Sequence, residues 1–189
     1  MMFEKSETLQ CLINAFAGES QARNKYTIYA KTAKKENYLL ISDVFLETAE
    51  NEREHAKLFY KFIPNGFYAP NAIYPFFLGS TYENLQSAAN AERDEWENVY
   101  KHASQVAKTE GFDDISHLFA NIAEIEKRHS HRFLMLSELL QNETLYKKEE
   151  ISQWICTKCG HTHIGKEAPC KCPVCNHEQR YFKLFSEKI

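Results

Sequence analysis

Two pairs of cysteines in this chain of 189 residues are spaced as metal ligands usually are. The pairs are Cys156-Thr-Lys-Cys159 and Cys172-Pro-Val-Cys175, with twelve residues between them. Two such Cys-x-x-Cys pairs can bring four thiolates to one ion with tetrahedral geometry. The spacing therefore predicts a mononuclear metal site, which would be structural with zinc and a one-electron carrier with iron.

Glutamates and histidines form a second set of candidate ligands. Glu52-Arg-Glu-His55 and Glu126-Lys-Arg-His129 each place a carboxylate and an imidazole one helical turn apart, so that both can reach the same ion. One such motif alone is more often part of a solvated helix face. Two of them at matching depth in two helices indicate a shared metal site.

Three further glutamates lie on the predicted interior faces of two other helices. Di-iron sites in helical bundles take one glutamate from each of two helices and a Glu-x-x-His motif from each of the other two. Glu19 and Glu92 complete that pattern, and Glu95 is one carboxylate beyond it. Burying one unpaired carboxylate costs several kcal/mol, so a group of buried carboxylates requires cations. We therefore predict a pair of carboxylate-bridged metal ions.

Two tyrosines lie about two helical turns from these candidate ligands. The hydroxyl groups of Tyr26 and Tyr100 could donate hydrogen bonds to the metal cluster. Large aromatic side chains at such positions more often serve packing. Both roles stay open for these two residues.

Four long segments with helical periodicity must position these side chains. Proline and glycine are scarce, at five and six residues, which favours long helices. We predict helices over residues 4–37, 40–63, 81–110 and 113–141, with Ser80 or Thr81 as a cap and Gly111 as a stop. Segment 64–80 is too long for a simple turn and too apolar for a mobile linker. We expect it to be a crossover packed along a four-helix bundle.

The interior face of each helix follows from steps of three and four residues. For 40–63 the face is Ile41, Phe45, Thr48, Glu52, His55, Phe59 and Phe62. For 81–110 it is Leu85, Ala88, Glu92, Glu95, Val99, His102 and Val106. For 113–141 it is Ile115, Phe119, Ile122, Glu126, His129, Phe133, Leu136 and Leu140. Each face carries its ionisable pair near the middle, which predicts one central site.

The chain divides into three predicted regions. Residues 1–141 form the helical metal domain, 142–153 a charged linker, and 154–189 a small cysteine-rich domain. A domain of about 35 residues buries too little apolar surface to fold alone. We expect Trp154, Tyr181 and Phe182 to pack around a metal that stabilises it.

Composition argues against several classes of function. The formal net charge is -3 and basic residues sit beside acidic ones, so no face for nucleic acid or anionic lipid is expected. Neither a signal core nor a membrane-length apolar run is evident, which predicts a cytoplasmic protein. Cys11 is expected to be a buried helix residue and Cys170 a free thiol. His161 and His163 are expected in a surface loop.

In this order the motifs resemble those of the rubrerythrin family, in which a ferritin-like di-iron bundle precedes a rubredoxin-like iron domain with short β strands. The resemblance covers essentially the whole chain. Its carriers are Ala17-Gly-Glu-Ser-Gln-Ala-Arg-Asn-Lys-Tyr26, Glu52-Arg-Glu-His55-Ala-Lys, Glu92-Arg-Asp-Glu95, Glu126-Lys-Arg-His129, Arg132-Phe-Leu134 and the two cysteine pairs.

Carried over residue by residue, the resemblance implies two irons and their ligands. The ligands are Glu19, Glu52, His55, Glu92, Glu95, Glu126 and His129. It also implies that Glu95 and His55 exchange as ligands when the iron changes oxidation state. A third iron, for which zinc can substitute, is implied at the four cysteines of the two pairs.

The resemblance further implies a peroxidase that reduces hydrogen peroxide to water in the cytoplasm of an anaerobic or microaerophilic microbe. Electrons from a reductase or a rubredoxin, with NAD(P)H as the usual distant donor, would pass through the four-cysteine iron. Relatives pair head to tail, so a homodimer or larger assembly is expected. His161, where relatives usually have an aromatic residue, and the extra Cys170 depart from the family pattern.

Two other functions fit parts of the sequence. A ferritin-like bundle can store iron, which requires a hollow shell of many subunits. The same bundle could instead sense peroxide or relay electrons to a partner. No side chain marks an NAD(P)H pocket, and no glycine-rich phosphate loop is present in the sequence.

Overall fold

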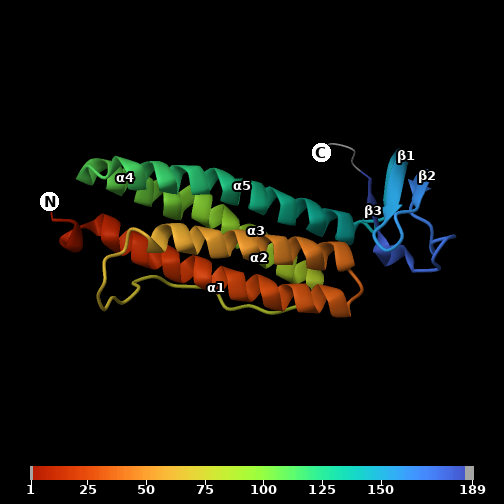
Figure 1. The fold of residues 1–189 in the computed structure, drawn as a ribbon, viewed down its shortest axis with the longest axis horizontal. Helices are drawn as coiled ribbons and strands as arrows, with labels where there is room; N and C mark the ends of the chain where they lie inside the picture. Colours follow the sequence, from red (N-terminus) through yellow and green to blue (C-terminus); the bar gives the residue numbers. More distant parts are fainter. Residues whose placement is uncertain (1, 186–189) are drawn as a thin grey trace.

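The computed structural model describes residues 2–185 and is mainly helical. A short turn, η1 (Phe3–Lys5), precedes α1 (Glu7–Lys35), α2 (Leu39–Tyr60), α3 (Thr81–Asp94), η2 (Glu95–Val99), α4 (Tyr100–Glu110) and α5 (Asp113–Gln141). The π-helical turn η2 joins α3 to α4 without a break. Figure 1 shows these helices side by side, with a small sheet at one end of the bundle. The predicted four-helix bundle is confirmed.

Capping residues account for the helix boundaries. The Ser6 hydroxyl accepts a hydrogen bond from the first turn of α1 at 3.1 Å. Ser80, one of the two predicted caps, forms a capping box with Glu83 at the start of α3. Gly111 follows α4 with a φ of 86°, a conformation that favours glycine at a helix end. Residues 113–141 form α5, with the predicted boundaries.

The π turn corrects the predicted interior face beyond Glu95. The predicted core positions that instead lie exposed or only partly buried are Val99, His102 and Val106. The buried residues are Tyr100, Ala103 and Ala107. A π turn holds about one residue more than an α-helical turn, so every later position rotates by one residue. Spacing alone could not reveal this insertion.

The second helix is shorter than predicted, and this corrects one more core position. Because α2 ends at Tyr60, Phe62 lies beyond it and is 37% exposed. The crossover that follows runs along α1 in Figure 1. Tyr29 on α1 donates a hydrogen bond to the carbonyl oxygen of Phe77 at 2.8 Å. The predicted packed crossover is therefore present.

Aromatic pairs lie on both sides of the central glutamates. Glu52 has a phenylalanine seven residues before it and another seven after it, and so does Glu126. The rings of Phe45 and Phe133 lie 5.1 Å apart, and those of Phe59 and Phe119 5.0 Å apart. All four are fully buried, so the glutamates sit between two apolar layers. Within residues 2–185 no helix is long and apolar enough to cross a membrane.

The small sheet is antiparallel, with strand order β2-β1-β3. It consists of β1 (Lys147–Cys156), β2 (Thr162–Glu167) and β3 (Phe182–Leu184), with the turn η3 (Gln179–Tyr181) before β3. Trp154 and Phe182 form its core with two of the cysteines. Antiparallel pairing of β1 with β2 and β3, together with packing around the buried Trp154, holds the small domain together.

The segment predicted as a linker is mostly ordered. Strand β1 starts at Lys147, inside 142–153, and Leu145 packs in the core of the bundle. Tyr146 contacts the cores of both domains. A charged composition did not predict strand pairing here, because partner residues in β2 supply the hydrogen bonds. Residues 1 and 186–189 of the predicted domains lie outside the described range.

Candidate metal centres

Six buried metal-binding side chains meet at the middle of the bundle. Helices α1, α2, α3 and α5 supply Glu19, Glu52, His55, Glu92, Glu126 and His129. The four carboxylates are completely inaccessible to solvent, and the two histidines are only 5% and 6% exposed. The sequence predicted each of these positions from helical spacing.

The six residues form two groups that share two glutamates. Glu19, Glu52, His55 and Glu126 offer ligand atoms within 4.8 Å of one another, and so do Glu52, Glu92, Glu126 and His129. Glu52 and Glu126 belong to both groups, so each can bridge two ions. The remaining glutamate and histidine of each group are terminal.

The histidine rings have matching positions in the two groups. Nδ1 of His55 lies 2.8 Å from Glu126 Oε1 and 2.9 Å from Glu52 Oε2. Nδ1 of His129 lies 2.7 Å from Glu126 Oε2 and 3.2 Å from Glu52 Oε1. Each imidazole therefore points the same nitrogen at both bridging carboxylates, as a pair of metal ligands would.

The donor set fits divalent cations. One carboxylate oxygen from each of Glu19, Glu52, Glu92 and Glu126 is buried without a hydrogen-bond partner. A buried carboxylate oxygen without a partner is costly, and four carboxylates together repel one another. Two divalent ions would balance the four negative charges and supply the missing partners. Carboxylate and imidazole ligands are those that iron accepts in bundle sites.

Electrostatics within the cluster is strong. Burial and the charge of Glu52 raise the pKa of Glu92 to about 8. Burial and the same neighbour raise the pKa of Glu19 well above its usual range. Burial opposes a charge on His55, but the nearby carboxylates of Glu126 and Glu52 prevail and raise its pKa to about 9. Pairs of groups that perturb one another in this way mark functional sites.

Two tyrosine hydroxyls contact the terminal glutamates. Tyr100 donates a hydrogen bond to Glu19 Oε1 at 2.5 Å, and Tyr26 donates one to Glu92 Oε1. Burial and the neighbouring carboxylates raise the pKa of both phenols well above the usual range. Both tyrosines therefore remain protonated donors, which resolves the open choice between packing and hydrogen bonding in favour of both roles.

Glu95 is the one predicted bundle ligand that belongs to neither group. It is the first residue of the π turn, is partly buried, and is among the residues that line a cavity also lined by Tyr100. A residue that sequence reasoning missed is Asn51, whose Oδ1 lies 3.3 Å from Nε2 of His129. Histidine ligands are usually oriented by such a contact. In the sequence, only the position of Asn51 directly before the predicted ligand Glu52 could have indicated this role.

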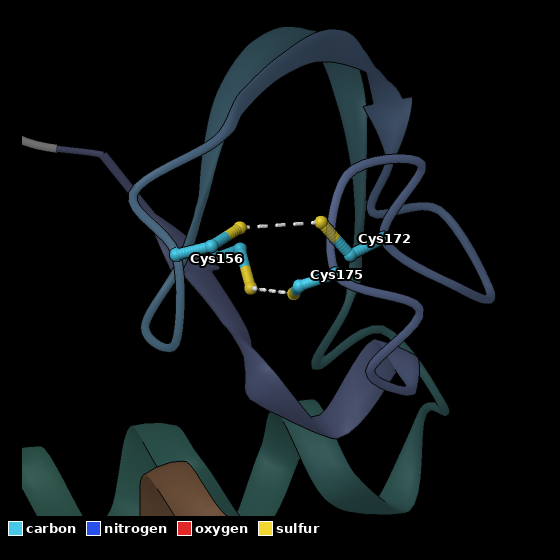
Figure 2. A group of neighbouring side chains, drawn as sticks. Cys156, Cys172 and Cys175 are labelled. Carbon is cyan, nitrogen blue, oxygen red and sulfur yellow. Dashed lines mark hydrogen bonds between the residues drawn. The ribbon is translucent and has the colours of Figure 1, made fainter.

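The four cysteines of the two pairs meet in the small domain. Figure 2 shows Cys156 facing Cys172 and Cys175 across the site. Sγ of Cys156 lies 3.7 Å from that of Cys175, and Sγ of Cys159 lies 3.5 Å from that of Cys172. None of them is in a disulfide. A tetrahedral ion with bonds of about 2.3 Å holds its sulfurs about 3.8 Å apart, so the set fits one ion.

The two cysteine loops have the same local geometry. Gly160 and Asn176 each follow the second cysteine of a pair, with φ of 76° and 59°. The backbone N–H of each donates to the carbonyl oxygen of the first cysteine at 2.9 Å. His161 is partly exposed in a loop, as predicted, whereas His163 lies in β2 opposite Trp154 and not in the predicted loop. Cys170 is exposed outside the four-cysteine group. Cys11 is partly buried on α1, less than predicted.

The fold and the two centres define a class of protein: a carboxylate-bridged di-iron bundle with an appended four-cysteine domain. The family model "Rubrerythrin" matches residues 10–137, and "Rubrerythrin, rubredoxin-like domain" matches 154–183. The chain belongs to the rubrerythrin family. It therefore has the family's di-iron site and its rubredoxin-like Fe(Cys)4 site.

Individual relatives match over nearly the whole chain. Rubrerythrin-1 of Clostridium acetobutylicum is 46% identical, over 96% of each chain. Rubrerythrin of Nitratidesulfovibrio vulgaris is 38% identical, over 95% of this chain and 94% of that one. Fully reduced, all-ferrous nigerythrin superposes with a TM-score of 0.65 at 30% identity, covering 97% and 92% of the two chains. Both domains thus have counterparts in the same order.

Proposed function

We propose that this chain is a peroxidase that reduces hydrogen peroxide to water. The reaction breaks one O–O bond and consumes two electrons and two protons for each pair of water molecules formed. Two adjacent ferrous ions, when bound, supply both electrons without release of a radical. The observation that carries the proposal is the pair of buried ligand groups that share Glu52 and Glu126 in a chain that also has a one-electron site.

Different residues of the chain would bind the ions, hold the terminal carboxylates and exclude water. Glu52 and Glu126 would bridge the ions, with Glu19 and His55 on one side and Glu92 and His129 on the other. Tyr26 and Tyr100 hold the terminal carboxylates through their hydroxyl groups. The buried phenylalanine pairs exclude bulk water from both ends of the site, which protects the reacting oxygens from side reactions.

We further infer that Glu95 and His55 alternate as ligands, as the family resemblance implies. The ligand group that includes His55 does not include Glu95. Glu95 lies at a π turn, a helix irregularity found frequently at functional sites. A carboxylate there can approach or leave the site with little disturbance of α3. His55 would bind in one oxidation state and Glu95 in the other.

Electrons would enter through the four-cysteine iron, from a reductase or a rubredoxin linked to NAD(P)H. Within one chain, α5 alone separates His129 from Gln141 by about 18 Å, and the cysteines lie beyond its end. This length favours transfer between the subunits of a head-to-tail homodimer. We place the activity in the cytoplasm of an anaerobe or microaerophile, as protection against oxidative stress.

Replacement of a bridging glutamate tests the proposal. Glu52→Ala should abolish peroxide turnover, because it removes a ligand that both ions share, while the visible spectrum of the cysteine site stays unchanged. Glu50→Ala is the matched control, since Glu50 is exposed on the same helix and pairs only with Arg53. Unchanged peroxide turnover in Glu52→Ala would reject the peroxidase.

Iron storage is the second candidate function. A bacterioferritin of Desulfovibrio desulfuricans superposes with a TM-score of 0.65, although at 19% identity this likeness concerns the fold alone. Storage requires a closed shell of many subunits around a mineral core. Analytical ultracentrifugation separates the two functions: a dimer or tetramer supports the peroxidase, and a large hollow assembly supports storage.

A further inference from the structure

A cavity of about 400 Å³ lies beside the di-iron site, between α1, the crossover and the α3–α4 segment. The floor of this cavity includes Glu95 and Tyr100, and its roof is formed by residues 72–75 of the crossover. The α1 wall includes three small residues, Ala15, Gly18 and Ala22, together with longer polar side chains. A cavity with small residues on one wall leaves space for a solute next to the helix.

One residue that lines the cavity is hydrogen-bonded to a carboxylate of the di-iron site. Tyr100 lines the cavity and donates its hydroxyl to Glu19 at 2.5 Å. Glu95 brings a second carboxylate to the same wall. A cavity on the opposite side of α1 is lined by Ser20, Arg53 and Lys57 together with other residues, none of which hydrogen-bonds to a cluster carboxylate. The two sides of α1 therefore differ in their connection to the site.

Asn14 on α1 is hydrogen-bonded to the crossover segment that forms the roof of the cavity. Asn14 accepts a hydrogen bond at Oδ1 from the backbone N–H of Asn71 at 2.7 Å, and its Nδ2 donates to the carbonyl oxygen of Asn71 at 3.1 Å. Its own carbonyl oxygen accepts from the Tyr74 hydroxyl at 2.8 Å. Asn14 and Tyr74 both line the cavity, so these bonds set the height of the roof.

We propose that this cavity is the entry path and binding site for the small oxidant, and that Asn14 is the positioning residue that limits the size of what enters. The inference rests on the proposed peroxidase function, since hydrogen peroxide is a small, polar solute. Asn90, Asp94 and Lys25 are among the lining residues, and polar side chains of these types can solvate such a molecule. A bulkier organic hydroperoxide would need the roof to lift.

Two matched substitutions on α1 test the path. Gly18 and Ser20 flank Glu19, one facing each cavity, so any distortion of Glu19 should affect both variants alike. A Cβ atom at Gly18 would meet Tyr74 Cε1 at 3.4 Å, an ordinary contact, so that Gly18→Leu can fold and fill the cavity. Ser20→Leu fills the other side. Ala91→Leu fills the same cavity from α3 and serves as a second variant if Gly18→Leu fails to fold.

The first readout is binding of azide to the oxidised protein, followed by its charge-transfer band. Gly18→Leu and Ala91→Leu should slow azide binding and oxidation by hydrogen peroxide by about tenfold or more, with Ser20→Leu close to wild type. If all three variants slowed azide binding and oxidation equally, or if only Ser20→Leu slowed them, the proposal that this cavity is the entry path would be rejected. Azide binding does not require peroxide reduction, so loss of the proposed function and loss of this inference remain distinguishable.

The second readout tests the role of Asn14. Asn14→Ala should raise the rate with tert-butyl hydroperoxide relative to the rate with hydrogen peroxide, because it removes both side-chain hydrogen bonds to Asn71 and leaves the roof held only by the bond from Tyr74 to the main-chain carbonyl of residue 14. Tyr29→Phe is the control, since Tyr29 also ties the crossover to α1, through the carbonyl oxygen of Phe77, but does not line the cavity. An unchanged rate ratio in Asn14→Ala, or an equal rise in Tyr29→Phe, would reject Asn14 as the residue that sets size selection.

Discussion

Glu52 and Glu126, the two glutamates shared by both ligand groups, are buried in apolar surroundings. Glu52 and Glu126 lie midway between buried phenylalanines, in the most apolar part of the bundle. A carboxylate there loses its hydration, and only a cation or a protonated partner can compensate. The hydrogen bonds from Nδ1 of both histidines and the carboxylate oxygens without partners indicate that these residues are arranged for bound cations.

The tyrosine hydroxyls offer a test at single-residue resolution. Tyr100→Phe should keep the fold, because the ring still packs on Phe59 and Phe119, but should leave Glu19 without its donor. Removal of one positioned hydrogen bond typically costs about tenfold to a hundredfold in metal affinity or activity. We expect slower peroxide turnover and a changed absorption spectrum of the oxidised di-iron site.

The control for this substitution is Tyr29→Phe. Tyr29 is equally buried on α1 but donates to the carbonyl oxygen of Phe77, away from the cluster. An identical change in turnover and spectrum in Tyr29→Phe and Tyr100→Phe would show that the effect is one of packing, not of hydrogen bonding to Glu19.

Seven bundle residues were predicted as ligands, and helical spacing was sufficient to predict that six of them lie together. Residues one or two turns apart on one face of a helix must point the same way, so Glu52 with His55 and Glu126 with His129 follow from geometry alone. Glu95 was not predictable in this way, because its position depends on the π turn that begins there. The contacts of Asn14 were also beyond prediction, since they join segments far apart in the sequence.

At the scale of the element, the π turn decides which face of α4 is buried. It adds one residue between Glu92 and the start of α4, and so brings Tyr100 and Ala103 inward. Without it, an α-helical register would turn Val99 and His102 toward the core. The turn therefore gives Tyr100 its contact with Glu19.

Deletion of one residue from the π turn tests this conclusion. Removal of Asn98, which is exposed, should convert the π turn into an α-helical turn, and Tyr100 and Ala107 should still face the core, because the lost residue and the lost wider turn compensate each other. Removal of Lys101, which is exposed in the regular part of α4, has no such compensation and should rotate Ala103 and Ala107 out of the core by about 100°. Urea unfolding should therefore show a loss of several kcal/mol for the Lys101 deletion and a much smaller loss for the Asn98 deletion. Equal destabilisation by the two deletions would contradict the role given to the turn.

The start of α1 is held by the last residue of α4. The carboxylate of Glu110, at the end of α4, accepts hydrogen bonds from the backbone N–H groups of Glu7 and Thr8 at 3.0 and 2.9 Å. Burial opposes its charge, but hydrogen bonds from Thr8 and Glu7 prevail and lower the pKa of Glu110. Such a cap contributes about 1 kcal/mol.

The pH dependence of this cap has a defined sign. Because the pKa of Glu110 is lower in the folded state, its stabilising effect is present above the unfolded value of about 4.3 and fades as the pH falls below it. Glu110→Ala should lower the free energy of unfolding at pH 7, and its difference from wild type should shrink below about pH 4. Glu124→Ala, at an exposed site on α5, is the control. A difference that is independent of pH would exclude the charged cap.

At the scale of the whole molecule, a bundle with its own core is joined to a domain that depends on a metal. The bundle has apolar layers on both sides of the di-iron site, whereas the sheet domain has one small core built on Trp154, Phe182 and two cysteines. The guanidinium of Arg180 donates to Asn37 Oδ1 at the α1–α2 turn and ties the two together. Stability should therefore be divided unequally between the domains.

Removal of metal should reveal this division. Chelation under reducing conditions should unfold residues 147–184, because a core of that size is too small to fold without its ion, while the bundle keeps its helices. Hydrogen exchange measured by mass spectrometry would follow both domains at once. Retained protection in β1 after the metal is lost would contradict the dependence, and simultaneous loss of protection in α5 would show that the two domains unfold together.

The most direct test of the central claim is to measure metal content and reactivity on the same sample, purified without oxygen. The reduced protein would be mixed with hydrogen peroxide and followed by stopped-flow absorption. A peroxidase with both centres should contain about three irons per chain and show rapid oxidation of the di-iron and Fe(Cys)4 sites. Zinc at the cysteines, or iron that does not react with peroxide, would contradict the claim.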